Sequence, residues 1–199
     1  LAETLAKAER PITDVGQIIH GTTLVTNALI ERKGAPTALI ATEGHRDSLE
    51  IGREHRYDLY DLQLEMPVPL VPRYLRFAVP GRTLADGSTL HELDEDYLAR
   101  LARELDAAGI EAVAIAFLNS FANPAMERQA REVVQQAAPN LRVSISADVV
   151  PEIREYERTS TTVANVYVQA RVERYLADLE ERLDRAGFHG SLLLMISSG

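Results

Sequence analysis

The chain has 199 residues, 46% hydrophobic and 26% charged, which is the composition of a folded globular protein and excludes a disordered or low-complexity chain. It carries 30 acidic against 21 basic residues, and the formal net charge of −9 argues against binding to nucleic acid or to an anionic membrane surface. The absence of cysteine excludes disulfides, thiolate metal sites and cysteine nucleophiles. Without a signal peptide or an apolar run of about 20 residues, the cytoplasm is the expected location.

Both ends of the chain have the pattern of a truncated sequence. Residues 1–10 have the pattern of the tail of a helix that Pro11 ends, and the first residue is Leu1 instead of methionine. The last residue, Gly199, directly follows an apolar run. We therefore expect a piece of a longer protein.

The first third of the chain predicts a strand, a helix and a second strand. A short apolar strand over 15–19 is followed by a turn over 20–23, a helix over 24–33 that Gly34 caps, and a β-branched strand over 37–42. This order is typical of a βαβ unit, in which two parallel strands are joined by a right-handed crossover.

The next stretch has a weaker pattern. Leu49 and Ile51 fit a strand or a short helix, while three prolines make 67–72 an extended loop. Alternating side chains over 74–79 predict a strand, and the Asp-Gly pair at 86–87 predicts a hairpin turn.

The second half predicts regular alternation of helices and strands. Asp94 caps a helix with one apolar stripe, which Gly109 ends, and 110–118 has the near-continuous apolar character of a strand buried on both faces. The further expected elements are a helix after Asn123-Pro124, a strand over 141–145, a long helix over about 152–186 and a strand over 191–196. The sequence therefore predicts an α/β fold with a mainly parallel or mixed sheet, without internal repeats.

The best candidate for a binding turn is His20-Gly21-Thr22-Thr23, because ligands bind beyond the carboxyl ends of strands in open α/β sheets. Glycine permits a close backbone approach, and two hydroxyls precede a helix whose free N–H groups and dipole favour a phosphate or carboxylate. The alternative is local: Thr22 or Thr23 only caps its helix, and His20 packs or hydrogen-bonds nearby.

A second candidate is the segment 152–162, where five charged residues are followed by four consecutive hydroxyl residues. Serine and threonine are poor helix formers, so the run indicates a helix start or an irregular turn at a cleft. The alternative is a solvated set of ion pairs beside a helix cap. The five histidines have no metal-ligand spacing, so no metal site is expected.

Long motifs at three places carry a resemblance to a known family. They are IIHGTTLVTNALIERKGAPTALIATEGHRDSLEIGRE at 18–54, VPEIREYERTSTTVANVYV at 150–168 and LLLMISSG at 192–199. In this order they resemble the amino-terminal region of the hydantoinase A / 5-oxoprolinase family, the N-methylhydantoinase A-like proteins, from about Val15 to Gly199.

The resemblance implies a ribonuclease-H-like fold of the actin/sugar-kinase/Hsp70 ATPase class, incomplete at both ends. Residues 1–190 would form the hydantoinase A amino-terminal region, as part of the first ATPase domain, and 191–199 the start of the next domain. Such proteins use ATP with Mg²⁺ to open a cyclic amide, such as a hydantoin or 5-oxoproline, beside a hydantoinase B-type partner subunit. The family's main phosphate loops would lie before Leu1 and after Gly199, so the fragment alone is expected to be inactive.

The resemblance also implies roles for residues in both candidate segments. His20 would donate a hydrogen bond to a substrate carbonyl or phosphate, Glu157 would orient water or Mg²⁺, and Arg158 would hold an anionic group, so these three are the expected catalytic residues. The residues expected to bind substrate or phosphate are Gly21, Thr22, Thr23, Asn27, Arg154 and Thr159. Two alternatives remain: a nucleotide-handling subunit of an ATP-dependent acetone or acetophenone carboxylase, and a non-catalytic assembly domain.

Overall fold

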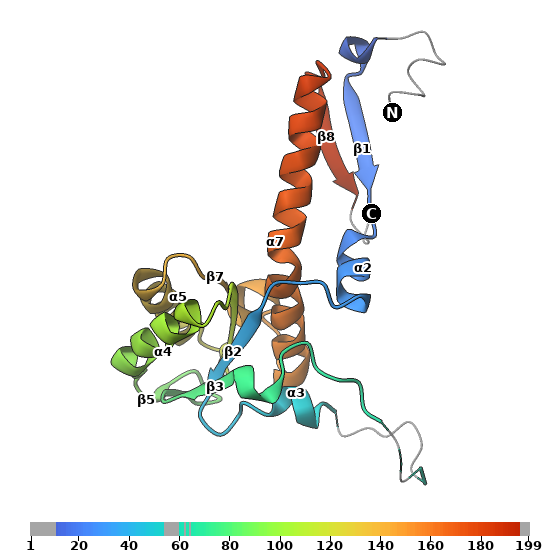
Figure 1. Cartoon of the computed structure of the whole chain (residues 1–199). Coiled ribbons are helices and arrows are strands. Elements are labelled where there is room, and N and C mark those ends of the chain that lie inside the picture. Colours follow the sequence, from blue (N-terminus) through green and yellow to red (C-terminus); the bar gives the residue numbers. More distant parts are fainter. Residues whose placement is uncertain (1–10, 54–59, 62, 64, 196–199) are drawn as a thin grey trace. The chain divides into compact units, whose positions relative to one another are not determined.

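The computed structural model of the chain describes residues 11–53, 60–61, 63 and 65–195 (Figure 1). The chain divides into two compact units. The central unit comprises 34–169, and the terminal unit comprises 1–33 together with 170–199. The predicted helix over 1–10 and Ile196, the last residue of the last predicted strand, lie outside the described residues.

A parallel four-stranded sheet forms the middle of the central unit. Its strand order is β3 (Arg76–Val79), β2 (Thr37–Thr42), β6 (Ala112–Ala116) and β7 (Arg142–Ile145), and neighbouring strands are parallel throughout. Every residue of β2 and β6 is buried, as expected for uninterrupted apolar or β-branched strands in the interior of a parallel sheet. The strand predicted over 37–42 is confirmed at both ends.

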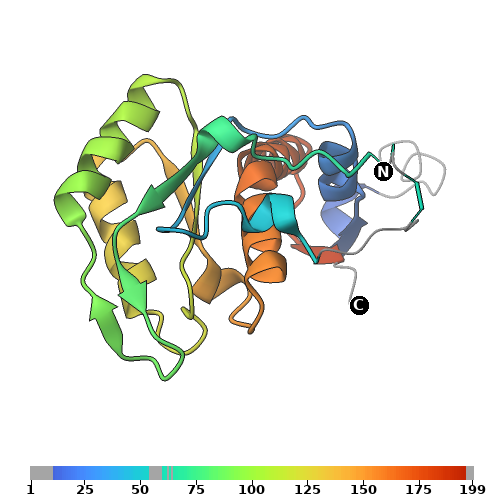
Figure 2. The same ribbon diagram turned by 90° about the horizontal axis from the view of Figure 1, so that it is seen from below.

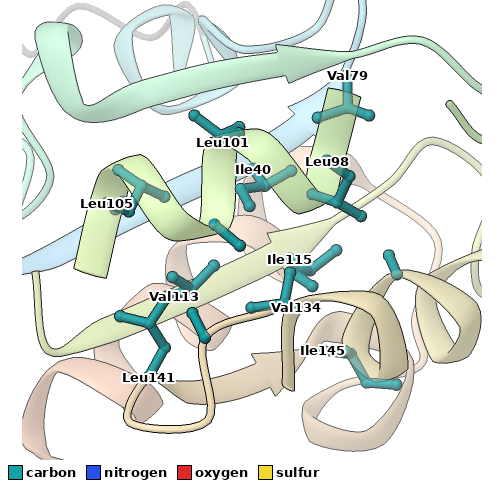
Figure 3. Packing of buried hydrophobic residues seen from close by; sticks show 14 of the residues in the cluster. Ile40, Val79, Leu98, Leu101, Leu105, Val113, Ile115, Val134, Leu141 and Ile145 are labelled. Atoms are coloured by element: carbon teal, nitrogen blue, oxygen red, sulfur yellow. The ribbon is translucent and has the colours of Figure 1, made fainter. Parts of the chain in front are cut away.

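Helices cover both faces of this sheet (Figure 2). On one face lie α4 (Glu95–Ala107) and α5 (Ala125–Ala137), whose apolar stripes pack on side chains of β2 and β6 (Figure 3). The first part of α7 (Glu155–Arg185), up to residue 169, covers the other face. Because side chains alternate along a strand, Ile40 faces α4 and α5 while its neighbour Leu39 is buried on the side of α7.

Local capping agrees with the sequence in both helices that pack on the first face. The Asp94 Oδ1 accepts a hydrogen bond of 2.9 Å from the backbone N–H of Tyr97 at the start of α4. The Asn123 Oδ1 accepts one of 3.0 Å from Ala125 N–H at the start of α5. Each side chain satisfies a helix-terminal N–H that has no partner inside the helix.

Short elements complete the central unit. The hairpin predicted around Asp-Gly is present as the antiparallel pair β4 (Arg82–Thr83) and β5 (Thr89–His91), with Gly87 at φ 85° in the turn. The other short elements are α3 (Ser48–Ile51), the 3₁₀ turn η2 (Arg73–Leu75) and α6 (Ser146–Val149).

The terminal unit contains a second parallel sheet, of two strands, β1 (Gln17–Gly21) and β8 (Ser191–Met195). They lie beside the carboxyl-terminal part of α7, and the unit also holds the 3₁₀ turn η1 (Ile12–Asp14) and α2 (Leu24–Ile30) (Figure 1). None of the described helices combines the length and apolar character needed to cross a membrane.

The βαβ prediction for the first third of the chain is wrong in its strand pairing. β1 pairs with β8, whereas β2 lies between β3 and β6 in the other sheet. The burial of the two strands explains the separation: β2 is buried on both faces, while β1 alternates between exposed and half-buried residues. Strand–helix–strand order does not by itself specify which strand each one pairs with, because pairing partners are set by long-range packing.

The predicted end of the first helix also needs correction. α2 ends at Ile30 instead of residue 33, and Arg32, at φ 52°, adopts the left-handed conformation that follows it. Gly34 is therefore not a helix cap. Its role is steric, because a Cβ placed on Gly34 would lie 2.2 Å from two ring carbons of Tyr167.

Candidate functional site

The first candidate segment lies at the carboxyl end of β1. His20 and Gly21 are the last two residues of this strand, and Thr22 and Thr23 connect it to α2. His20 is half-buried, whereas Gly21, the two threonines and Asn27 are exposed. The turn predicted at 20–23 thus begins two residues later, and its polar groups lie at the surface of the terminal unit.

The hydroxyls of this turn make local contacts. The Thr22 Oγ1 accepts a hydrogen bond of 3.2 Å from Leu24 N–H, and Asn27 Nδ2 donates to the Thr23 Oγ1 at 3.4 Å. Thr23 occupies the N-cap position but its side chain makes no cap hydrogen bond. Thr22 thus makes a local capping contact, and the roles of Thr22, Thr23 and Asn27 in ligand binding stay predictions.

The His20 ring has a long-range partner that the sequence pattern did not indicate. Its Nε2 lies 2.7 Å from the hydroxyl oxygen of Tyr175, on the part of α7 that belongs to the terminal unit. The two rings stack, with centroids 5.7 Å apart and an interplanar angle of 28°. The two residues stand 155 positions apart in the chain, so no local motif could have joined them.

The second candidate segment forms the beginning of α7, in the central unit. Arg154, just before the helix, is exposed and has the positive φ of 96°, which is uncommon for a residue with a side chain. The four hydroxyl residues lie inside the helix instead of at its start. Ser160 Oγ donates to the Glu157 carbonyl at 3.2 Å and Thr162 Oγ1 to the Arg158 carbonyl at 2.7 Å, so the preceding turn satisfies these two hydroxyls.

Glu157 and Arg154 lie together on a cleft of about 480 Å³, which Gly52, Arg53 and Tyr156 also line. The Arg53 Nε donates a hydrogen bond of 2.6 Å to Glu157 Oε1. The backbone N–H of Glu157 itself, and next the Arg53 guanidinium, hold the pKa of this carboxyl below its ordinary value. The carboxylate is therefore kept ionised at the edge of the cleft.

The hydrogen bond from Arg53 to Glu157 predicts how the pKa of Glu157 changes when Arg53 is replaced. We expect Arg53→Gln to raise the pKa of Glu157 only part of the way to its ordinary value, because its own N–H remains as the larger cause. Since the folded pKa lies below the unfolded one, the stabilisation by Glu157 is present above the unfolded pKa and is lost as pH falls through the folded pKa.

Carbon-13 NMR titration of the Glu157 carboxyl measures this shift. The control is Arg103→Gln, which removes an exposed arginine from α4. A Glu157 pKa that is unchanged in Arg53→Gln, or that returns fully to the ordinary value, would contradict the expectation.

Arg158 occupies a different environment from its neighbour. Its side chain is buried, with 1% of the residue exposed, and its Nη1 and Nη2 donate hydrogen bonds to Ser120 Oγ at 2.6 Å and to the Phe117 carbonyl at 2.7 Å. Burial lowers the pKa of the guanidinium, and the carboxylates of Glu127 and Glu155 oppose this shift. Through these two hydrogen bonds, Arg158 connects the start of α7 to the segment that follows β6. Its expected role as an anion-binding residue stays a prediction; Thr159, next to it, is also buried.

A chain of buried polar groups continues from Arg158. Ser120 Oγ lies 3.0 Å from Ser146 Oγ, which in turn donates to Glu127 Oε1 at 2.6 Å. Glu127 also accepts hydrogen bonds from the backbone N–H groups of Phe117, at 2.7 Å, and Ala147, at 2.8 Å. We name these four side chains, Arg158, Ser120, Ser146 and Glu127, the buried polar chain.

No role was predicted from the sequence for Ser120, Ser146 or Glu127, although Ser120 lies in 119–123, a segment that follows a predicted strand. One signal was available for Glu127: it lies three residues before Ala130 and seven before Val134, on the apolar stripe of α5. A charged residue in such a stripe indicates a buried charge that needs partners. Ser146 carries no comparable signal.

The predicted site residues therefore belong to two groups. His20, Gly21, Thr22, Thr23 and Asn27 lie together in the terminal unit, and Arg154, Glu157, Arg158 and Thr159 lie together in the central unit. In the part of the chain that the structure describes, no three histidine, aspartate or glutamate side chains gather as they would around a metal ion.

These observations define a class of protein: an α/β protein with mainly parallel sheets, whose accessible polar groups follow the carboxyl end of one strand and the start of a long helix. The chain belongs to the hydantoinase/oxoprolinase family. The model of the family described as the hydantoinase/oxoprolinase N-terminal region matches residues 1–138, which confirms the resemblance found in the sequence.

Curated relatives and a solved structure agree with this assignment. The chain is 39% identical over 178 residues to the caprolactamase subunit alpha of Pseudomonas jessenii, covering 88% of this chain and 26% of that subunit. The crystal structure of the ATP-dependent caprolactamase from the same organism matches with a TM-score of 0.90 and 36% identity, over 97% of this chain and 29% of that one.

Two other relatives have names that state different reactions. The acetophenone carboxylase gamma subunit of Aromatoleum aromaticum is 32% identical over 195 residues, which is 92% of this chain and 27% of the subunit. The 5-oxoprolinase of Saccharomyces cerevisiae is 29% identical over 200 residues, which is 88% of this chain and 16% of that protein. The chain thus spans about a quarter, or less, of the length of these relatives.

Proposed function

We propose that this chain is part of an ATP-dependent hydrolase that opens cyclic amides of the hydantoin or 5-oxoproline type. The observation that carries the proposal is the similarity to the ATP-dependent caprolactamase, in fold over 97% of the chain and in sequence at 36% identity. The name of that enzyme states ATP-dependent action on a lactam, which is a cyclic amide. We further propose the ribonuclease-H-like class for the fold, the division between 1–190 and 191–199, and a cytoplasmic location.

In the proposed reaction the γ-phosphoryl group of ATP is transferred to the oxygen of the amide. ADP is released in this transfer, and water then attacks the activated carbon. The ring nitrogen takes up a proton and leaves as an amine, which breaks the carbon–nitrogen bond, and a second water hydrolyses the resulting acyl phosphate to release phosphate. The protein mainly positions the reactants and stabilises charge, as in other phosphoryl transfers.

The polar groups of the terminal unit suit the first step. His20 would donate a hydrogen bond to the amide carbonyl or to a phosphate oxygen, and the exposed Gly21, Thr22 and Thr23 would contact phosphate. Asn27, whose side chain already contacts the Thr23 hydroxyl, would hold that hydroxyl in place.

The polar groups of the central unit divide between contact and positioning. Glu157 and Arg154 line an open cleft, so they would orient water and hold an anionic group. Buried Arg158 and Thr159 would keep this part of α7 in place. Enzymes that use ATP bind Mg²⁺ through one or two carboxylates together with the phosphates, so Mg²⁺ is part of the proposal and the Glu157 carboxylate at the cleft would orient this ion or water.

A partner subunit is part of the proposal. Two of the relatives are named as subunits, the caprolactamase alpha and the acetophenone carboxylase gamma subunit, and this supports assembly with a second chain. We propose that this second chain is of the hydantoinase B type.

The second candidate function is nucleotide handling in an ATP-dependent ketone carboxylase, which the 32% identity to the acetophenone carboxylase gamma subunit favours. ATP turnover by the complete protein with its partner subunit, in the presence of 5-oxoproline, hydantoins or acetone, separates the two. Stimulation by a cyclic amide supports the hydrolase, and stimulation by acetone with bicarbonate supports the carboxylase. Absence of nucleotide binding and turnover would favour a non-catalytic assembly domain. The 199-residue chain alone is expected to show no turnover.

Substitution of His20 tests its assigned role. In the complete protein, His20→Ala is expected to lower kcat by about 100-fold, the effect of removing one donor that stabilises developing charge. Its melting temperature is expected to change little, because the His20 ring is only half-buried. The matched control is His91→Ala at the exposed end of β5, which should leave kcat unchanged. A parallel loss of stability and turnover in His20→Ala would instead indicate a structural role.

A further inference from the structure

The pair formed by His20 and Tyr175 has a geometry that selects one form of the histidine ring. The distance of 2.7 Å between the Tyr175 hydroxyl oxygen and His20 Nε2 is that of a strong hydrogen bond. The stacked rings, 28° from parallel, hold the imidazole in one orientation. Both residues lie in the terminal unit and both are half-buried, so solvent competes only in part for this hydrogen bond.

Elementary chemistry assigns the direction of the bond in the neutral ring. A phenol O–H is a stronger donor than a neutral imidazole N–H, and an imidazole nitrogen with a free electron pair is a stronger acceptor than a phenol oxygen. The favoured arrangement therefore has Tyr175 O–H donating to Nε2. The proton of the ring must then be on Nδ1, because a neutral imidazole carries a single N–H.

We infer that Tyr175 is a positioning residue that fixes His20 as the neutral Nδ1–H tautomer and thereby makes it a hydrogen-bond donor toward the reacting group. The catalytic part of this inference rests on the proposed function; the tautomer part does not. With Nε2 occupied by the tyrosine, the ring has no free acceptor nitrogen, so His20 cannot act as the general base that takes a proton from water. It polarises an amide carbonyl or phosphate oxygen through Nδ1–H, without a change in its own protonation.

The tautomer is measured by long-range ¹H–¹⁵N correlation spectra of the chain labelled with ¹⁵N-histidine. The chain has five histidines, and the signals of His20 are identified by their absence in His20→Gln. We expect the Nδ1–H pattern for His20 in the wild-type chain. In Tyr175→Phe, which keeps the stacked ring and removes the hydroxyl, we expect a shift toward the Nε2–H form that free imidazole side chains prefer.

The control is Tyr74→Phe, since Tyr74 is 78% exposed in η2 and belongs to the central unit. It should leave the His20 signals unchanged. An Nε2–H pattern in the wild-type chain, or identical patterns in wild type and Tyr175→Phe, would overturn the inference.

Kinetics of the complete enzyme test the catalytic part separately. Tyr175→Phe is expected to lower kcat on the order of 10-fold with little change in KM, as is typical for loss of the outer partner of a functional histidine. A merely structural role would lower the melting temperature and leave kcat per folded molecule unchanged, which would contradict the inference. If the complete protein shows no ATP-dependent turnover while the spectra show the expected tautomer, the proposed function fails and the assignment of Tyr175 as the residue that fixes the tautomer stands.

Discussion

Replacement of Arg158 by methionine is expected to lower the free energy of unfolding of the central unit by about 3–5 kcal/mol, the usual cost of leaving a buried charge without its opposite charge. The Arg158 guanidinium is linked to Glu127 through the two serines, and its Nη2 lies 3.6 Å from Glu155 Oε1. The substitution leaves the Glu127 carboxylate buried without a positive charge on the buried polar chain. It also leaves Ser120 Oγ and the Phe117 carbonyl without the N–H groups that now donate to them. Both losses act in the interior, where an unsatisfied polar group is costly.

Urea unfolding followed by far-ultraviolet circular dichroism measures this change. The control is Arg185→Met on the same helix, where the arginine side chain is 72% exposed and pairs with Glu181. That variant should change the stability by no more than about 0.5 kcal/mol, as for other exposed ion pairs.

A second variant distinguishes the charge pair from simple packing. The double substitution of Arg158→Met with Glu127→Leu removes both charges, so it should be more stable than the sum of the two single effects predicts. A loss below 1 kcal/mol in Arg158→Met, or additive effects in the double variant, would mean that the buried polar chain does not hold α7 to the sheet.

Replacement of Gly34 by alanine is expected to destabilise the central unit by about 1–3 kcal/mol, the typical cost of overpacking. The new methyl group would lie 2.2 Å from two carbons of the Tyr167 ring, far inside van der Waals contact. The ring cannot move away easily, because Tyr167 is buried and its carbonyl accepts a hydrogen bond of 2.9 Å from Ala35 N–H, next to the substituted residue.

Thermal and urea unfolding of the variant test this steric role. Gly16→Ala is the matched control, since a Cβ at Gly16 meets no atom within 4 Å and its backbone is not in the left-handed region. The combination of Gly34→Ala with Tyr167→Leu should recover part of the lost stability because the smaller side chain leaves room for the methyl group. A stable Gly34→Ala protein would show that the close approach relaxes at little cost.

The elements that the sequence predicted well are those whose cause is local. The strand over 37–42 was predicted at both ends because a continuous β-branched and apolar run is typical of a strand that is buried on both faces. The helix after Asp94 was predicted with its cap because an aspartate oxygen satisfies a helix-terminal N–H within three residues. In both cases the physical cause lies within one element of the chain.

The elements that the sequence predicted poorly depend on partners far along the chain. β1 was expected to pair with the next strand, but its partner β8 is the last described strand. Four hydroxyl residues were expected at a helix start or in an irregular turn, yet they lie inside α7, where preceding carbonyl groups accept hydrogen bonds from Ser160 and Thr162. Serine and threonine have low helix propensity, but the burial of Val163 and Val166 on the same helix outweighs this preference.

The candidate site was also predicted only in part from the sequence. Sequence motifs were enough to identify the family and to select the His20-Gly21-Thr22-Thr23 turn and the beginning of α7, because a family signature is a property of the residues themselves. They did not show that Glu157 lines a cleft while its neighbour Arg158 is buried, since adjacent helical residues point about 100° apart and only the packing decides which side is interior.

By itself, then, the sequence determined the α/β class, most of the regular elements and the family, because these follow from local patterns of apolar, capping and motif residues. Tertiary structure alone decided which strands pair, which charges are buried and which side chains meet. The contact of His20 with Tyr175 and the path from Arg158 to Glu127 each join residues that are distant in the chain. Such contacts form only when the whole unit folds, because the free energy that holds them comes from burial shared by many residues.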